Sequence, residues 1–324
     1  MIIWEFCKKI AVIVLSFGYL VASIFGGNGF DSILRYKHTI KTIDCYTNTL
    51  KDAAPQTDIY KYIKNHFESE LPEGKTVKKA IVIGYDGCRA DMLAKIDGEH
   101  PSAIKAVLDE GGNAFLTYCG GKNFPYWNTQ ASSTAPGWCS MMTGVWADKH
   151  GVTDNAIVKS DEYPTLMLSL VENKTIDSSA FYVSWGGHFS DDDATYISEK
   201  NYIEQSKINA EYICSDDDSG TKECTLNNLK QTDCSDFIFS IFEYPDHVGH
   251  GAGFSPYNEE YPAAFYEAEE TGTEILNTIK ARPTYDTEDW LIIITADHGG
   301  STLGHGFVTI QERMTFVVAN KEVR

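Results

Sequence analysis

The sequence predicts an α/β fold in which a mainly parallel central sheet carries helices on both faces. From Lys78 onward, short apolar runs alternate with amphipathic stretches, and strands buried on both faces of a parallel sheet have such continuous apolar sequences. The chain has 324 residues, of which 43% are hydrophobic and 23% are charged, as in ordinary globular proteins. This length and composition suit one large α/β domain with a small extra segment, and they exclude a disordered, collagenous or multi-span membrane chain.

The first element is an uncharged apolar segment at residues 10–27. Lys8 and Lys9 precede it, as in a signal peptide or a signal anchor. As a helix, its 18 residues are just long enough to cross the core of a bilayer, and a buried core helix is the alternative. Because no good small-x-small cleavage site ends the segment, we predict that residues 1–27 are an uncleaved anchor rather than a removed signal peptide.

The next two segments differ in their sequence patterns. Residues 28–75 are predicted to be a linker with helical segments, ending at the breaker Leu71-Pro72-Glu73-Gly74. Residues 76–324 are predicted to form the main domain. Within it, strands are expected at the apolar runs 80–85, 114–118, 180–185, 237–244 and 290–296, and helices at residues 102–110 and 259–279.

Three of the expected strands end in carboxylates, and histidines accompany two of these ends. The residues concerned are Asp86, Asp246, His250, Asp297, His298 and, slightly later, His305. A single aspartate after a strand is often only a turn or helix-capping residue, but turn chemistry does not require imidazoles. Functional groups gather beyond the carboxyl ends of parallel strands, and carboxylate and imidazole ligands without thiolate suit zinc or a similar divalent ion. The pattern therefore predicts a metal site at this edge of the sheet.

A hydroxyl group is expected near the same edge. In the segment Ser133-Thr134-Ala135-Pro136, the proline suits the first turn of a helix that ends at Gly144. Ser133 or Thr134 could serve only as the helix cap. Thr134 could instead be a nucleophile, because free N–H groups at a helix start bind phosphate oxygens and a metal ion can lower the pKa of a bound hydroxyl.

Together these residues resemble the alkaline phosphatase superfamily, and most of all its type I phosphodiesterase/nucleotide pyrophosphatase branch. The resemblance covers about three-quarters of the chain, from Lys78 to the C-terminus. Its motifs are Asp86-Gly87, Thr134-x-Pro136 followed by Thr143-Gly144 and His150-Gly151, the Pro-Asp-x-x-x-His pattern of Asp246 and His250, and Asp297-His298-Gly299. It implies an alkaline-phosphatase-like fold, with residues 76–324 as the catalytic domain.

The resemblance also implies a reaction and a set of ligands. It implies metal-dependent hydrolysis of phosphate esters, above all phosphodiesters or nucleotide pyrophosphates, through a phosphothreonine at Thr134. Two divalent ions would be bound, with Zn²⁺ favoured. One would be held by Asp86, Thr134, Asp297 and His298. The other would be held by Asp246, His250 and a later histidine, which His305 matches best. Asn155 matches an asparagine that helps to hold a phosphoryl oxygen.

Other functions are weighed against this interpretation. A phosphomonoesterase of the same superfamily needs a cation for the extra charge of its substrate, and Arg89 is the one nearby candidate in the sequence. A surface-anchored binding module with a structural metal needs no threonine at a helix start. A sulfatase is disfavoured because sulfatases have cysteine or serine at the position of Thr134 and arginine at the position of Trp138.

The charge of the chain limits its partners. Acidic residues number 46 against 27 basic ones, which gives a net charge of −19. We therefore expect no nucleic-acid-binding surface. The expected partner is a small phosphate ester, with bound cations balancing its charge. The domain is expected outside the cytoplasmic membrane, anchored through residues 10–27 or secreted if that segment is cleaved, and the sequence does not indicate an oligomeric state.

The acidic run Asp216-Asp217-Asp218 lies between Cys214 and Cys224. It lacks the spaced ligand pattern of a calcium loop. We interpret it as a solvated acidic loop.

Overall fold

The computed structural model describes residues 53–323, apart from residues 97 and 122–128. From Ala53 onward the chain forms one compact unit. The apolar segment at residues 10–27, and with it the expected membrane anchor, lies outside the described residues. Within the described part, no helix is long and apolar enough to cross a membrane.

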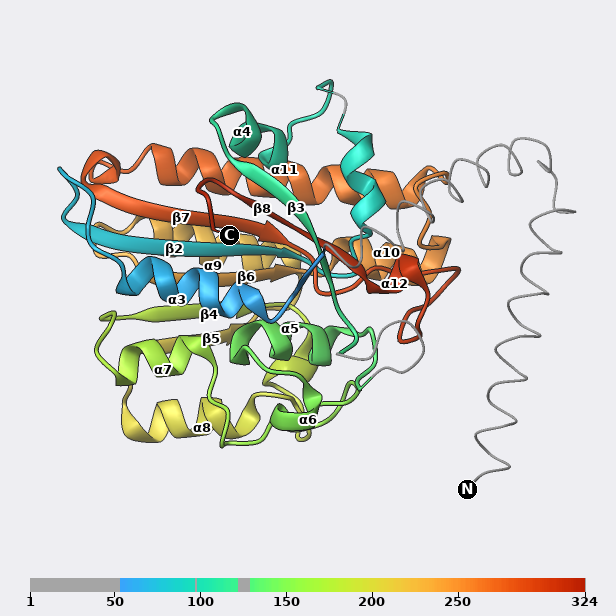
Figure 1. Cartoon of the computed structure of the whole chain (residues 1–324), viewed down its shortest axis with the longest axis horizontal. Coiled ribbons are helices and arrows are strands. Elements are labelled where there is room, and N and C mark those ends of the chain that lie inside the picture. The colour runs from blue at the N-terminus through green and yellow to red at the C-terminus, as the bar shows by residue number, and fades with distance from the viewer. Residues whose placement is uncertain (1–52, 97, 122–128, 324) are drawn as a thin grey trace, which may run out of the picture. The chain divides into compact units, whose positions relative to one another are not determined.

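An eight-stranded sheet with the strand order β1-β3-β8-β7-β2-β6-β4-β5 forms the centre of this unit. Neighbouring strands are parallel, except that β8 runs antiparallel to β3 and β7. The strands are β1 (Ala54–Pro55), β2 (Val77–Tyr85), β3 (Asn113–Tyr118), β4 (Ser179–Val183), β5 (Ala210–Cys214), β6 (Phe237–Phe242), β7 (Glu288–Thr295) and β8 (Met314–Ala319). Because β7, β2 and β6 are adjacent and parallel, their carboxyl ends meet at one edge of the sheet (Figure 1).

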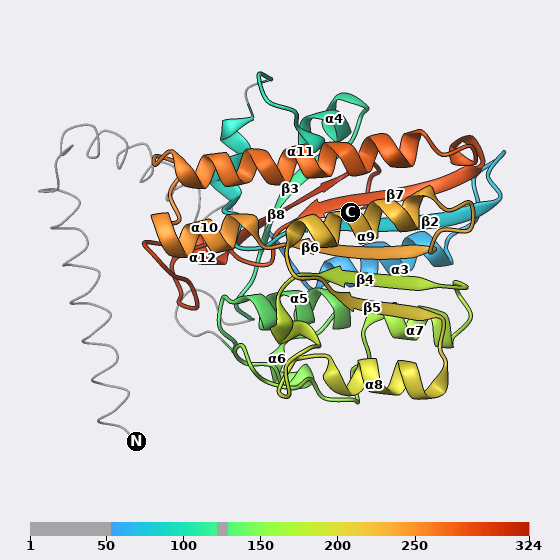
Figure 2. The same cartoon turned by 180° about the vertical axis from the view of Figure 1, so that it is seen from behind.

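Helices cover both faces of the sheet (Figures 1 and 2). They are α3 (Asp58–Glu68), α4 (Ala103–Asp109), α5 (Thr134–Thr143), α6 (Ala147–His150), α7 (Leu166–Glu172), α8 (Ile197–Ser206), α9 (Asp218–Lys230), α10 (Tyr244–Ala252), α11 (Glu260–Lys280) and α12 (Ile310–Arg313). One buried apolar cluster joins the sheet to α3, α5 and α7, and a second joins it to α4, α9 and α11. Along β2, Val82 belongs to the first cluster while Ile81 and Ile83 belong to the second, as the alternation of side chains along a strand requires.

The expected mixed α/β fold is confirmed, while several element boundaries differ by a few residues from expectation. Part of the expected linker at residues 28–75 lies in the compact unit, where α3 packs Ile59, Ile63 and Phe67 into the core because these apolar residues share one helix face. The strand expected at 237–244 ends at Phe242, and Tyr244 begins α10. Pro245 accounts for this early end, because proline suits the first turn of a helix and cannot donate to a sheet.

Candidate active site

Three aspartates lie together at the carboxyl ends of the central strands. Asp86 directly follows β2, Asp297 lies two residues after β7, and Asp246 lies in the first turn of α10, which follows β6. The backbone N–H of Gly87 donates a hydrogen bond of 3.1 Å to Asp297 Oδ1, which joins the ends of the first two strands directly. The order β7-β2-β6 therefore brings together residues that are far apart in the sequence.

Thr134 is the first residue of α5, and its hydroxyl faces these groups. Its Oγ1 donates to Asp86 Oδ1 at 3.3 Å and lies 3.4 Å from His298 Nε2. The residue before it, Ser133, occupies the N-cap position without making a capping hydrogen bond; its hydroxyl lies 3.2 Å from His305 Nδ1 instead. The two neighbouring hydroxyls thus have different partners: that of Thr134 contacts Asp86, and that of Ser133 contacts His305.

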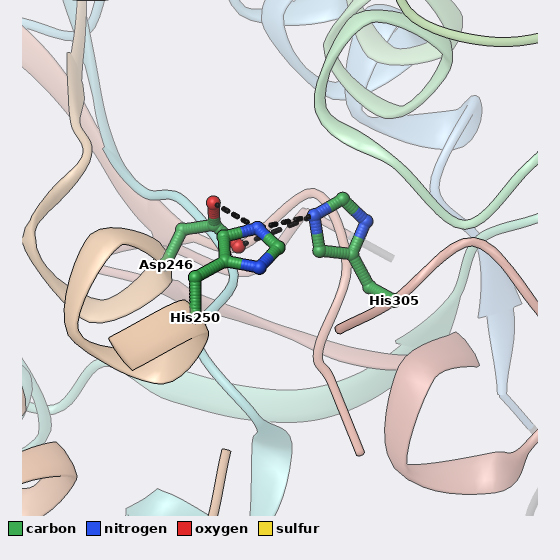
Figure 3. Close-up of side chains that lie close together, drawn as sticks. All are labelled: Asp246, His250 and His305. Atoms are coloured by element: carbon green, nitrogen blue, oxygen red, sulfur yellow. Dashed lines mark hydrogen bonds and ion pairs between the residues drawn. The ribbon is translucent and has the colours of Figure 1, made fainter. Parts of the chain in front are cut away.

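A second group of side chains consists of Asp246, His250 and His305, which point toward one another (Figure 3). The first two are one helical turn apart on α10, and His305 comes from the loop between β7 and α12. His250 Nε2 lies 3.2 Å from Asp246 Oδ2, and His305 Nε2 lies 3.5 Å from Asp246 Oδ1. Asp246 also belongs to a group with Asp86 and His298 whose ligand atoms lie within 4.8 Å of one another, so the two groups are contiguous.

The histidines of the site share one hydrogen-bond arrangement. Nδ1 of each ring contacts a backbone carbonyl oxygen, that of Leu303 for His250 (3.0 Å), Gly299 for His298 (2.7 Å) and Ser132 for His305 (3.2 Å). A carbonyl oxygen only accepts, so in the neutral ring Nδ1 carries the proton and Nε2 keeps its lone pair. Metal-binding histidines are oriented in this way.

The buried charges of the site lack ordinary compensation. Asp86 and Asp297 are fully buried, and among the described residues the ion-pair partners of Asp86, Asp246 and Asp297 are all histidines. Burial raises the pKa of Asp86 well above its usual range, as do Glu243 and Asp246, and burial together with Asp86 does the same for Asp297. One oxygen each of Asp246 and Asp297 is buried without a hydrogen-bond partner.

These observations fit divalent cations. Buried carboxylates are costly unless a positive charge accompanies them. Nε2 of His250 and Nε2 of His305 lie only 3.1 Å apart, and two lone pairs at this distance repel unless a proton or a cation lies between them. The donor set of oxygen and imidazole nitrogen without thiolate suits zinc or a related first-row ion.

A family model for type I phosphodiesterase / nucleotide pyrophosphatase matches residues 80–314. The chain belongs to this family. No curated protein matches it in sequence.

Several solved structures are similar in fold to this family member. Murine ectonucleotide pyrophosphatase / phosphodiesterase 5 is 15% identical with a TM-score of 0.45, over 69% of this chain and 57% of that one. Alkaline phosphatase from the Antarctic bacterium TAB5 is 12% identical with a TM-score of 0.46, over 76% and 91% of the two chains. A 2-O GAG sulfatase is 13% identical with a TM-score of 0.47, over 75% and 64%. The chain thus spans less than two thirds of the length of the murine protein.

Two residues that the sequence associated with phosphate make other contacts in this family member. Asn155 Oδ1 accepts a hydrogen bond of 2.9 Å from the backbone N–H of Ala135. This bond holds the side-chain amide of Asn155 at the start of α5. The Arg89 guanidinium donates to the carbonyl oxygen of Phe254 at 2.8 Å and forms an ion pair with Asp91. The side chain of Asn155 therefore contacts the residue that follows Thr134, whereas Arg89 is bound to the loop that follows α10.

Sequence reasoning missed two residues that touch or face the aspartates. Trp138 lies four residues after Thr134, on the same side of α5, and its indole N–H donates to Asp86 Oδ2 at 2.8 Å. A side chain at Gly84 would lie 2.4 Å from this indole, so only glycine leaves room for it. Glu243 is a fourth carboxylate, whose pKa is raised well above its usual range by burial and by Asp246. Its place three residues before Asp246 was the available signal.

His150 holds the far end of α5 and gives a testable pH dependence. Its Nδ1 accepts from the N–H of Val152 at 3.1 Å, and its Nε2 lies 3.1 Å from Ser140 Oγ. Burial lowers the pKa of His150 from 6.5 to about 3, so its contribution to stability is complete above pH 6.5 and is lost as the pH falls. We expect the stability advantage of the wild type over His150→Gln to shrink by about 1.4 kcal/mol per pH unit below pH 6.5. Urea unfolding of both proteins over this range measures it, and a gap independent of pH would contradict it.

Proposed function

We propose that this protein hydrolyses phosphodiesters at a centre of two divalent cations, with Thr134 as the nucleophile. The observation that carries the proposal is the position of Thr134 Oγ1, between Asp86 Oδ1 at 3.3 Å and His298 Nε2 at 3.4 Å. A threonine that only capped α5 would direct its hydroxyl to a backbone N–H group. Thr134 instead directs it into a buried group of aspartates and histidines, where the described residues pair these aspartates with histidines alone.

The residues divide into two ligand sets. Asp86, Thr134, Asp297 and His298 would hold one cation, and Asp246, His250 and His305 would hold the other. Zn²⁺ suits both sets, because neither contains a thiolate and both offer imidazole Nε2 atoms. When bound, the two cations would lower the pKa of the Thr134 hydroxyl and neutralise the charge of the phosphoryl and leaving oxygens.

The chain itself supplies the nucleophile and its orientation. Thr134 Oγ1 attacks phosphorus, so that a bond from threonine to phosphorus forms while the bond to one ester oxygen breaks. The threonine proton is released to solvent, the departing alkoxide gains a proton from solvent, and water then hydrolyses the phosphothreonine to release a phosphate monoester and restore the threonine hydroxyl. Asn155 supports this step, because its Oδ1 is fixed at Ala135 and its Nδ2, which donates to no described residue, can donate to a phosphoryl oxygen.

The charges favour a diester over a monoester. A monoester brings one more negative charge, which needs a further cation in the site. Arg89 is the residue that the sequence offers, and its guanidinium is held by Phe254 and Asp91. The ion-pair partners of the three aspartates within the described chain are histidines alone.

The test compares two chromogenic substrates on one preparation of the full chain. We expect kcat/KM for bis-p-nitrophenyl phosphate to exceed that for p-nitrophenyl phosphate by about tenfold, which corresponds to about 1.4 kcal/mol of transition-state stabilisation. A tenfold preference for the monoester would make the protein a phosphomonoesterase, with Arg89 as the next residue to replace. Hydrolysis of neither ester, with metal bound, would favour a binding module.

A further inference from the structure

Helix α10 carries Asp246 and His250, yet its N-terminus is capped from another helix. The N-cap residue of α10, Glu243, makes no capping hydrogen bond with its side chain. Asp218, the first residue of α9, accepts hydrogen bonds from the N–H groups of Glu243 and Tyr244, at 3.0 Å on Oδ1 and 2.9 Å on Oδ2. The N–H groups of a first helical turn need such partners, because the helix itself provides none.

Asp218 is buried in the fold. The expectation that residues 216–218 form a solvated loop is therefore wrong for Asp218, while Asp216 and Asp217 are exposed. Oδ1 of Asp218 also accepts a hydrogen bond of 2.7 Å from the hydroxyl of Ser184, the residue after β4. Burial raises the pKa of the carboxyl group, while the N–H groups and the serine oppose this shift. One carboxylate therefore joins the end of β4, the start of α9 and the start of α10.

We propose that Asp218 is a positioning residue that fixes the first turn of α10 and thereby sets the cation affinity of the site formed by Asp246, His250 and His305. This inference rests on the proposed function, because it requires that these three residues bind a cation. Both anchored N–H groups lie within three residues of Asp246. Without the anchor, the first turn can fray, and the Asp246 carboxylate loses its fixed distance to His305. The Asp86 and Asp297 ligands follow other strands, and Asp218 makes no hydrogen bond to them or to their neighbours among the described residues.

The variants Asp218→Ala and Asp218→Asn test this inference, with Asp217→Asn as the matched control. Asp217 is the exposed neighbour that caps α9 itself, accepting from the N–H of Gly220 at 2.9 Å. Asparagine caps a helix as well as aspartate does, so Asp217→Asn removes one charge at nearly the same place without releasing α10. Asp218→Asn leaves one acceptor oxygen where two are used, and Asp218→Ala leaves none.

Zinc affinity of the full chain is measured by competition with a chromophoric chelator, so that the readout does not depend on activity. We expect two zinc ions in the wild type, and in Asp218→Ala a dissociation constant at least ~10-fold higher for one of them, as is usual when the support of a metal site is removed. Asp218→Asn should be intermediate, and Asp217→Asn should match the wild type. Excess zinc should restore hydrolysis by Asp218→Asn, which a purely structural defect would not permit.

The outcomes separate the inference from the function on which it rests. Wild-type zinc affinity in Asp218→Asn and Asp218→Ala would overturn the positioning role alone, and so would an equal loss in Asp217→Asn, which would indicate a general effect of charge. If Asp218→Ala does not fold, the comparison of the two asparagine variants decides. A wild type that binds no zinc would overturn the proposed metal centre and, with it, this inference.

Discussion

Replacing Thr134 with alanine is expected to lower kcat/KM for bis-p-nitrophenyl phosphate by at least ~10³-fold. The substitution removes the only protein atom that forms a bond to phosphorus in the proposed reaction, and it leaves the aspartates and histidines in place. Thr134→Ser keeps the hydroxyl at the start of α5 and should retain part of the rate. Steady-state kinetics of the variants, at equal bound zinc, measure the effect.

Ser133→Ala is the matched control for this prediction. Both hydroxyls lie at the start of α5, but Ser133 Oγ lies 3.2 Å from His305 Nδ1, whereas Thr134 Oγ1 donates to Asp86. We expect Ser133→Ala to remain active with a modest loss, because His305 Nδ1 also contacts the carbonyl oxygen of Ser132. An inactive Ser133→Ala beside an active Thr134→Ala would show that the nucleophile is the serine.

The central strands could be predicted from the sequence, because burial on both faces makes β2, β6 and β7 almost continuously apolar. The edge strand β5 escaped prediction since most of its residues are only partly buried. Strand β1 has two residues, too few for any pattern. Strand β8 was not among the expected strands either, although it is largely apolar. Its antiparallel direction depends on pairing with β3 and β7, which local sequence does not show.

The site was predictable to the extent that its residues follow strands. The expected aspartates and histidines lie together in the structure because they follow adjacent strands or line one loop. Contacts across the fold were not predictable in this way. The sequence offered Trp138 only as an argument against a sulfatase, and its hydrogen bond to Asp86 depends on how α5 crosses β2. The buried role of Asp218 depends similarly on the start of α9 lying next to the start of α10, which no local pattern reveals.

Removing divalent cations with a strong chelator is expected to abolish hydrolysis, and added zinc should restore it. Without cations, Asp86, Asp246 and Asp297 face one another with only histidines as ion-pair partners in the described chain, and the proposed reaction has no means of neutralising the phosphoryl oxygens. Zinc should also stabilise the fold, by about 2.7 kcal/mol at a concentration 100 times its dissociation constant. Activity assays and thermal unfolding before and after zinc addition measure both effects.

A pair of histidine variants on α10 shows whether zinc acts through the proposed ligands. His250→Ala removes a ring whose Nε2 lies 3.2 Å from Asp246, and it should lower both the zinc affinity and the activity severely. His247→Ala removes an exposed ring from the same helix. It should leave the zinc affinity and the activity unchanged, because His247 belongs to neither ligand set. Equal losses in the two variants would instead indicate non-specific binding of zinc by histidines. Full activity of the dialysed, metal-free protein would exclude the two-cation centre, because the proposed reaction depends on cations to neutralise the phosphoryl and leaving oxygens.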